Sequence, residues 1–136
     1  MSPGPTPRGL LDTSIFIATE SSRQMRTELI PDVGAISIVT KAELRAGVLA
    51  AKDIETRDRR LATLDLVARI AAFPIDESVA RAWAQMRAYL AASGRRVNAN
   101  DMWIAATAAA REIPVITQDA DFEVLSGVAG LEVIAA

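Results

Sequence analysis

Four acidic side chains stand where a predicted buried strand gives way to a predicted helix, and together they suit metal-dependent chemistry. The four are Asp12, Glu43, Asp101 and Asp119. In an open parallel sheet the carboxyl ends of the strands share one edge, so we expect these acids to converge there. Clustered carboxylates raise one another's pKa, and such a site gains from a bound cation. Oxygen ligands alone favour a hard cation, Mg²⁺ or Mn²⁺, over zinc.

Each acid also has a purely structural explanation. Glu43 matches a capping box with Thr40, and Asp101 suits the positive end of a helix dipole, an effect of about 0.3–1 kcal/mol. Asp119 suits the N-cap of the helix that follows it, and Asp12 suits a turn contact with nearby backbone N–H groups. Capping needs only an oxygen acceptor, which a neutral side chain also supplies. Four charged residues at four such corners therefore favour a shared site.

The composition narrows the chemistry further. The 136 residues include no histidine and no cysteine, which excludes disulfides, thiolate chemistry and the usual general base. The formal net charge of −2 provides no general attraction to nucleic acids or anionic membranes. With no histidine, any catalysis must rest on carboxylates, hydroxyls, lysine or arginine, and hard cations.

The elements that must position the acids alternate between strand and helix. The predicted strands are Gly9–Asp12, Val33–Val39, Phe73–Ile75, Pro114–Thr117 and Leu131–Ile134. The predicted helices are Ser14 to about Glu20, Arg23–Ile30, one opened by Thr40, Ile54–Ala72, Glu77–Ser93 with Gly94 as C-cap, Asn100–Glu112 and Ala120–Leu125. This alternation predicts an α/β fold with a mainly parallel central sheet flanked by helices.

Residues 9–136 are expected to form a single domain, preceded by a flexible proline-rich tail at residues 1–8. No apolar run reaches the roughly 18 residues of a membrane span, and the first residues do not resemble a secretory signal. A cytoplasmic location is therefore expected. Trp83 and Trp103 are interpreted as core residues, with stacking on a nucleic-acid base as the alternative. The apolar helix behind Asp101 is expected to hold that carboxylate still.

The segments LLDTSIFI, TKAELRAG, NANDMWIAATA and VITQDADF resemble, in this order and spacing, the acidic motifs of PIN-domain ribonucleases. The similarity is greatest to the VapC toxins of bacterial toxin–antitoxin pairs and covers essentially the whole chain after Arg8. The resemblance implies a three-layer, Rossmann-like PIN fold and a Mg²⁺-dependent endoribonuclease, with Mn²⁺ as a substitute. With no histidine to deprotonate a ribose 2′-hydroxyl, the expected route is hydrolysis of RNA phosphodiester bonds by metal-activated water, which leaves 5′-phosphate and 3′-hydroxyl ends. It also implies a cognate VapB-type antitoxin, an RNA substrate and a homodimer.

The resemblance assigns a role to each acid. Asp12 and Asp101 resemble the principal metal ligands, while Glu43 and Asp119 resemble the remaining acids, acting directly or through metal-bound water. Asp121 lies two residues beyond Asp119, and either could complete the site. Asp119 is preferred because it directly follows the end of the PVIT strand.

Polar and basic residues near these acids are further candidates. Thr117 resembles a hydroxyl position of the same pocket, and Ser14 stands where related chains often carry asparagine. The candidates for RNA binding are Lys41, Arg45, Arg95 and Arg96. The cluster of Arg57, Arg59 and Arg60 is interpreted as a solvated helix face with ion pairs, because acidic residues interrupt it.

Two other functions fit parts of the pattern. The first is a metal-dependent phosphatase or DNA nuclease on a similar sheet. An aspartyl-phosphate phosphatase would need a second aspartate two residues after Asp12, where this chain has Ser14. The second is a catalytically silent PIN-like module that binds RNA or a protein partner. Loss of an acid would favour it, but all four positions are filled.

Overall fold

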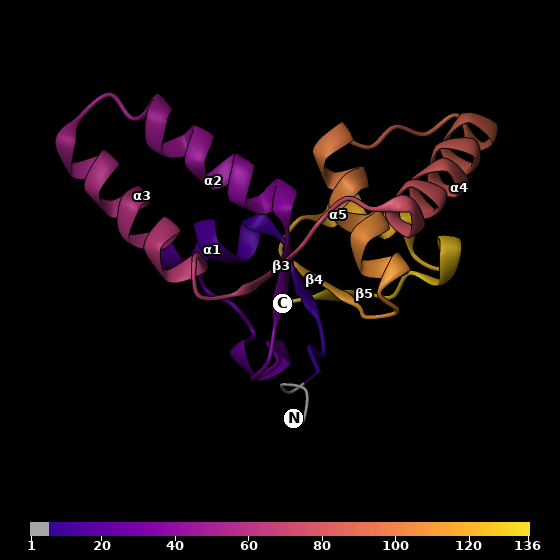
Figure 1. Ribbon diagram of the computed structural model, residues 1–136, viewed down its shortest axis with the longest axis horizontal. Coiled ribbons are helices and arrows are strands. Elements are labelled where there is room, and N and C mark those ends of the chain that lie inside the picture. Colours follow the sequence, from indigo (N-terminus) through magenta and orange to yellow (C-terminus); the bar gives the residue numbers. More distant parts are fainter. Residues whose placement is uncertain (1–5) are drawn as a thin grey trace.

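Five short parallel strands form the centre of the computed structural model, which describes residues 6–136 (Figure 1). They are β1 (Leu10–Leu11), β2 (Ala35–Ser37), β3 (Ala71–Phe73), β4 (Val115–Thr117) and β5 (Val133–Ala135). Their order in the sheet is β3-β2-β1-β4-β5, and every neighbouring pair is parallel. The predicted α/β class and parallel sheet are confirmed. Strands β1, β2 and β4 are shorter than predicted, while β3 begins two residues before the predicted strand and β5 begins two residues after it.

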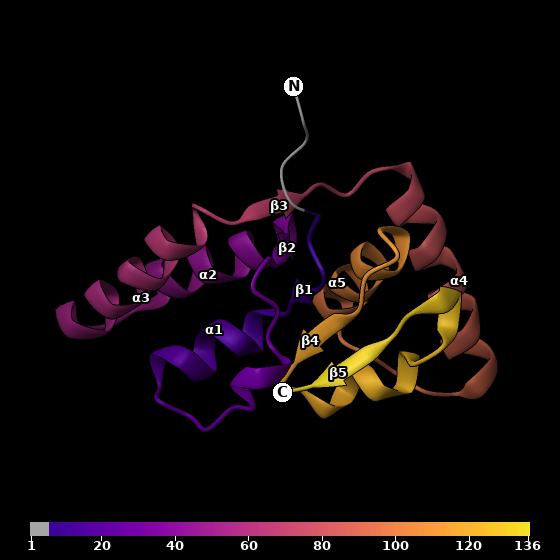
Figure 2. The same cartoon turned by 90° about the horizontal axis from the view of Figure 1, so that it is seen from below.

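Helices cover both faces of the sheet (Figure 2). On one side lie α1 (Thr13–Glu20), α2 (Ile38–Ala50) and α3 (Ile54–Val67); on the other lie α4 (Glu77–Ser93) and α5 (Ala99–Ala110). Successive strand residues point to opposite faces. In β1, for example, buried Leu10 joins the core beneath α4 and α5, and buried Leu11 joins the core beneath α1, α2 and α3.

Two helices begin earlier than the sequence pattern predicts. Ser37, not Thr40, caps α2, since the backbone N–H of Val39 donates to Ser37 Oγ over 3.1 Å. The capping box of Thr40 with Glu43 is therefore wrong, because Glu43 lies beyond the first turn. Similarly, Asp12 and not Ser14 caps α1. Glu43 is thus free of any capping role.

Other boundaries also differ from the predictions. The predicted helix at Arg23–Ile30 is wrong: a single 3₁₀ turn at Thr27–Leu29 stands there, because Pro31 keeps Ile30 extended and the segment has no buried apolar face. The helix predicted to reach Ala72 ends at Val67. Helix α4 has the predicted bounds and ends at Gly94, whose φ of +69° suits glycine.

The C-terminal part contains two more 3₁₀ segments, Ala120–Leu125 and Val128–Gly130. The sequence predicts a short helix at Ala120–Leu125, and the structure has a 3₁₀ segment there, which buried Phe122 and Leu125 attach to the core. The rings of Trp83 and Trp103 stack with centroids 4.9 Å apart and pack α4 against α5, as the core interpretation predicts.

The predicted tail at residues 1–8 lies mostly outside the described residues, which begin at Thr6. Arg8 is not loose, because its backbone N–H donates to the carbonyl of Val33 over 2.9 Å. Among residues 6–136, no helix combines the length and the apolar character needed to cross a membrane.

The sheet core predicts a clear difference between two identical substitutions. Ile36 is fully buried in β2, whereas Ile54 at the start of α3 is 78% exposed. We expect Ile36→Val to lower the free energy of unfolding by about 0.5–1.5 kcal/mol, because it leaves a methyl-sized void. Ile54→Val is the matched control and should change that free energy by less than about 0.5 kcal/mol. Urea denaturation measures both, and equal losses would contradict this account of the core.

Candidate functional site

The carboxyl ends of β1 and β4 mark the topological switch point of the sheet, where the strand order reverses its direction. Strands β2 and β3 lie on one side of this pair and β5 on the other. Ligands of open α/β sheets bind at such a switch point. Asp12 follows β1 directly, is only 3% exposed, and accepts hydrogen bonds from Thr117 Oγ1 at the end of β4 (2.9 Å) and from the backbone N–H of Ser14 (3.3 Å).

Asp101 lies in the first turn of α5 but does not cap it. Asn98 is the N-cap and accepts from the backbone N–H of Asn100 over 2.8 Å. Burial of the side chain, followed by neighbouring negative charges, raises the pKa of Asp101 to about 7. These charges belong to Asp12, Asp119, Glu43 and Asp121. The four acids predicted from the sequence therefore gather around one place, and Asp121 joins them.

Asp101, Asp119 and Asp121 form the tightest part of this group. One carboxylate oxygen from each lies within 4.8 Å of the other two. Asp119 is placed by two local hydrogen bonds: its backbone N–H donates to Thr117 Oγ1 (2.8 Å), and its Oδ1 accepts from the backbone N–H of Asp121 (2.9 Å). Both aspartates thus reach Asp101, where the sequence indicated one or the other.

Glu43 is held through both of its carboxylate oxygens. Thr13 Oγ1 donates to Oε1 over 2.7 Å, and Asn100 Nδ2 donates to Oε2 over 3.4 Å. The Thr13 hydroxyl also lies 2.9 Å from that of buried Thr40. Because the single hydroxyl proton of Thr13 goes to the carboxylate, Thr40 donates to Thr13. A directed chain therefore runs from Thr40 through Thr13 to Glu43.

A second chain of the same kind ends on Asp12. The hydroxyls of Ser14 and Thr117 are 3.2 Å apart, and Thr117 gives its proton to Asp12, so Ser14 donates to Thr117. The backbone N–H of Gln118 donates to Ser14 Oγ over 2.9 Å. The two polar residues predicted to lie beside the acids, Ser14 and Thr117, thus contact each other next to Asp12.

Thr13 and Thr40 were missed by sequence reasoning. Thr13 directly follows Asp12, and Thr40 lies one helical turn before Glu43, so their positions contained a signal. The role of Thr40 was missed because the sequence pattern around it is typical of a helix cap.

The donor set suits a hard divalent cation. All the side chains in the group offer carboxylate oxygens, and among residues 6–136 no lysine or arginine forms an ion pair with any of these five acids. Carboxylates left without a cationic partner are the ligands that Mg²⁺ and Mn²⁺ prefer.

The predicted basic residues do not join the acids. Lys41 and Arg45 line a groove between α2 and α3, together with Leu61 and Leu64, and none of the five acids lines it. Arg95 and Arg96 are exposed on the loop that leads into α5. A role of these four in RNA binding stays a prediction.

The raised pKa of Asp101 has a pH-dependent consequence for folding. Folding raises this pKa from an ordinary 3.8 to about 7, so ionisation of Asp101 destabilises the folded protein as the pH rises through that range. Asp101→Asn removes the ionisation. In EDTA we expect it to raise the Tm at about pH 8 and to raise it less at about pH 5.

Asp58→Asn is the matched control, because Asp58 is exposed on α3 and the substitution removes the same charge. It should show no comparable gain on moving from the lower to the higher pH. Thermal unfolding followed by circular dichroism measures both variants, and equal gains would contradict the electrostatic cluster.

The chain is similar to known proteins over most of its length. The family model of the PIN domain matches residues 9–128. A Mycobacterium tuberculosis protein named ribonuclease VapC5 is 58% identical over 126 residues, which are 93% of this chain and 93% of that protein. Ribonuclease VapC4 of the same bacterium is 43% identical over 121 residues, which are 89% of this chain and 93% of that protein.

A solved structure of a similar protein has the same fold. The crystal structure of a member of the VapBC family of toxin–antitoxin systems, VapBC-5 from Mycobacterium tuberculosis, superposes with a TM-score of 0.88 at 53% identity. The match covers 96% of this chain and 100% of that chain. The chain therefore belongs to the PIN-domain family and, within it, to the VapC proteins.

Proposed function

We propose that this protein is a metal-dependent endoribonuclease and the toxin of a toxin–antitoxin pair. The observation that carries the proposal is the gathering of four acids around Asp101, the five coming from four separate parts of the chain. Among residues 6–136, no lysine or arginine forms an ion pair with any of them. The similar proteins VapC5 and VapC4 are named ribonucleases.

We assign the metal to the acids that the sequence singles out: Asp12, Glu43, Asp101 and Asp119. The close approach of Asp101, Asp119 and Asp121 supports Asp121 as a further oxygen donor. Mg²⁺ is the proposed ion, with Mn²⁺ as a substitute. When bound, such an ion lowers the pKa of water and screens the phosphate from the carboxylates.

Neighbouring residues hold the carboxylates of Asp12 and Glu43 in position. Ser14 and Thr117 hold Asp12, while Thr13 and Asn100 hold both oxygens of Glu43. Fixed carboxylates can orient the attacking water and accept its proton without first reorganising. The products would carry 5′-phosphate and 3′-hydroxyl ends, which sequencing of the cleaved ends can identify.

We propose a VapB-type antitoxin as the partner, because the matched crystal structure is that of a VapBC family member. A homodimer also stays a prediction, which the molecular mass in solution would test.

Removal of a metal ligand or of the metal should abolish cleavage. We expect Asp101→Asn to lower cleavage of labelled RNA in Mg²⁺ by more than about 100-fold, because the metal loses a charged ligand. EDTA should abolish cleavage by the parent protein, and Mn²⁺ should restore it. Asp58→Asn is again the control and should cleave like the parent. Undiminished cleavage by Asp101→Asn would remove the site assignment, and cleavage of DNA alone would favour the DNA-nuclease alternative.

The hydroxyl that holds Glu43 should also matter. Thr13→Val keeps the shape of the side chain but removes the donor to Glu43 Oε1. We expect activity to fall by about 10–100-fold and the Mg²⁺ concentration for half-maximal rate to rise, as for other groups that orient metal ligands. Thr13→Ser should retain both values near those of the parent. If Thr13→Val lowers only the Tm and leaves the Mg²⁺ dependence unchanged, Thr13 is structural only.

A further inference from the structure

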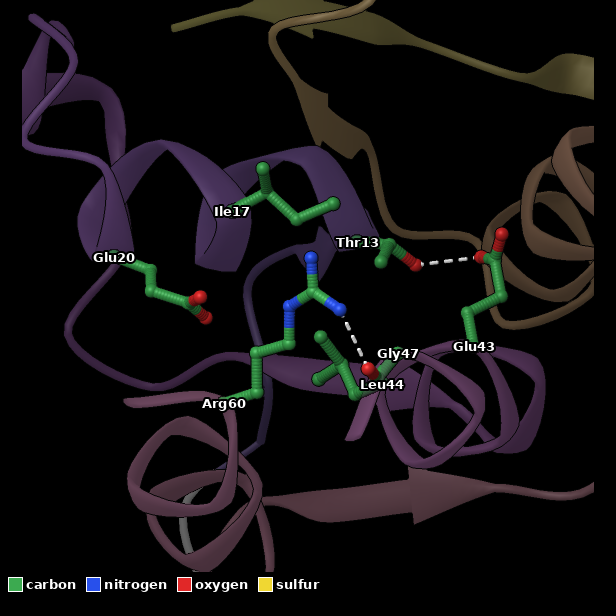
Figure 3. A pocket seen from close by; sticks show the side chains of 7 residues that line it. All are labelled: Thr13, Ile17, Glu20, Glu43, Leu44, Gly47 and Arg60. Atoms are coloured by element: carbon green, nitrogen blue, oxygen red, sulfur yellow. Dashed lines mark hydrogen bonds between the residues drawn. The ribbon is translucent and has the colours of Figure 1, made fainter. Parts of the chain in front are cut away.

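A cavity of about 280 Å³ lies between α1, α2 and α3, next to the acidic site (Figure 3). Thr13 and Glu43 line one end of it, and both also belong to the hydrogen-bonded chain described above. Ile17 and Leu44 line its middle. The cavity is therefore continuous with the proposed catalytic group through side chains that both share.

The guanidinium of Arg60 points into this cavity from α3 (Figure 3). Arg60 Nη1 donates to the carbonyl oxygen of Gly47 in α2 over 2.6 Å, which fixes the orientation of the planar group. Arg60 is partly buried. The sequence interpretation of Arg60 as part of a solvated face is therefore wrong, because this side chain turns inward between α2 and α1.

Two carboxylates line the same cavity, those of Glu20 and Glu43, and other residues already contact both. Thr63 Oγ1 donates to Glu20 Oε2 over 2.9 Å, and Arg59 Nε lies 3.6 Å from Glu20 Oε1. Glu43 accepts from Thr13 and Asn100, as described above. Within residues 6–136, no carboxylate lies within ion-pair distance of Arg60. Only Nη1 of Arg60 donates to Gly47, so the other N–H groups of its guanidinium are available to an anionic ligand.

We propose that this cavity binds a phosphate of the RNA strand beside the bond that is cleaved, with Arg60 as the residue that contacts it. Ile17 and Leu44 then pack against the sugar or base of the same nucleotide. A fixed guanidinium presents parallel N–H groups that match two phosphate oxygens. The inference rests on the proposed function, because it takes the bound strand to be the substrate.

Charge favours a nucleic-acid strand as the occupant. The five neighbouring acids repel phosphates, so a strand that enters the site needs a positive contact beside them. Of the basic residues predicted to bind RNA, Lys41 and Arg45 line a groove that none of the five acids lines. Arg60 supplies this contact in the middle of the cavity, where its guanidinium lies between Ile17 and Leu44 (Figure 3).

The test measures RNA binding separately from cleavage. In the Asp101→Asn background with Mg²⁺, fluorescence anisotropy of a labelled single-stranded RNA is recorded over a series of salt concentrations. We expect Arg60→Gln to weaken binding by about 10-fold, as loss of a charge-assisted hydrogen bond does. The slope of log affinity against log salt should fall by about 0.7, the value for one phosphate contact on a single strand.

Two further variants make the result decisive. Arg87→Gln removes the same charge from the exposed face of α4, on the other side of the sheet, and should leave affinity and slope unchanged. Ile17→Glu adds a negative charge to the cavity at a position that is 51% exposed, so the fold should tolerate it. It should weaken RNA binding as Arg60→Gln does.

The outcomes separate this proposal from the broader one. If the parent protein cleaves RNA but Arg60→Gln and Ile17→Glu bind it with parental affinity and slope, the cavity is not a phosphate site. The proposal is also overturned if these two variants lose only the binding of a VapB-type antitoxin. If the parent protein cleaves no RNA in Mg²⁺, the proposed function fails, whatever the binding data show.

Discussion

Mutual repulsion of carboxylates is the constraint around which this site is built. Burial of Asp101, together with the charges of four neighbouring acids, raises its pKa to about 7. No lysine or arginine of residues 6–136 pairs with the group. Such an arrangement costs stability unless a cation binds, and the rest of the fold must hold it in place.

Two features of the structure hold the acids against this repulsion. Helix α5 is anchored by a run of buried residues from Ile104 to Ala109, which sets the position of its first turn. In addition, the hydroxyl of Thr117 donates a hydrogen bond to Asp12, and the hydroxyl of Thr13 donates one to Glu43. Neutral donors hold these two carboxylates in place without adding positive charge that would compete with a metal.

The positive charge needed to attract a substrate is kept apart from the acids. Arg60 comes from α3 and reaches the neighbouring cavity by crossing toward α2, where Gly47 supplies the carbonyl that fixes it. The two functions proposed here, metal binding and phosphate binding, thus occupy adjoining spaces that Thr13 and Glu43 separate. This separation avoids an internal ion pair that would quench both.

The sequence by itself determined the alternation of strands and helices and the placing of the acids at their junctions. Both depend on local apolar patterns and on the rule that parallel strands end at one edge. The resemblance of four short motifs was sufficient to indicate the family. These features could be predicted because each depends on neighbours in the chain.

Only the tertiary structure decided which side chains meet. Asp121 lies near Asp101 beside Asp119, Thr40 donates to Thr13 instead of capping a helix, and Arg60 turns inward. All three arrangements depend on where helices start and on contacts between distant segments. A shift of one or two residues in a helix start rotates every side chain to another face, and the sequence pattern does not define those starts that finely.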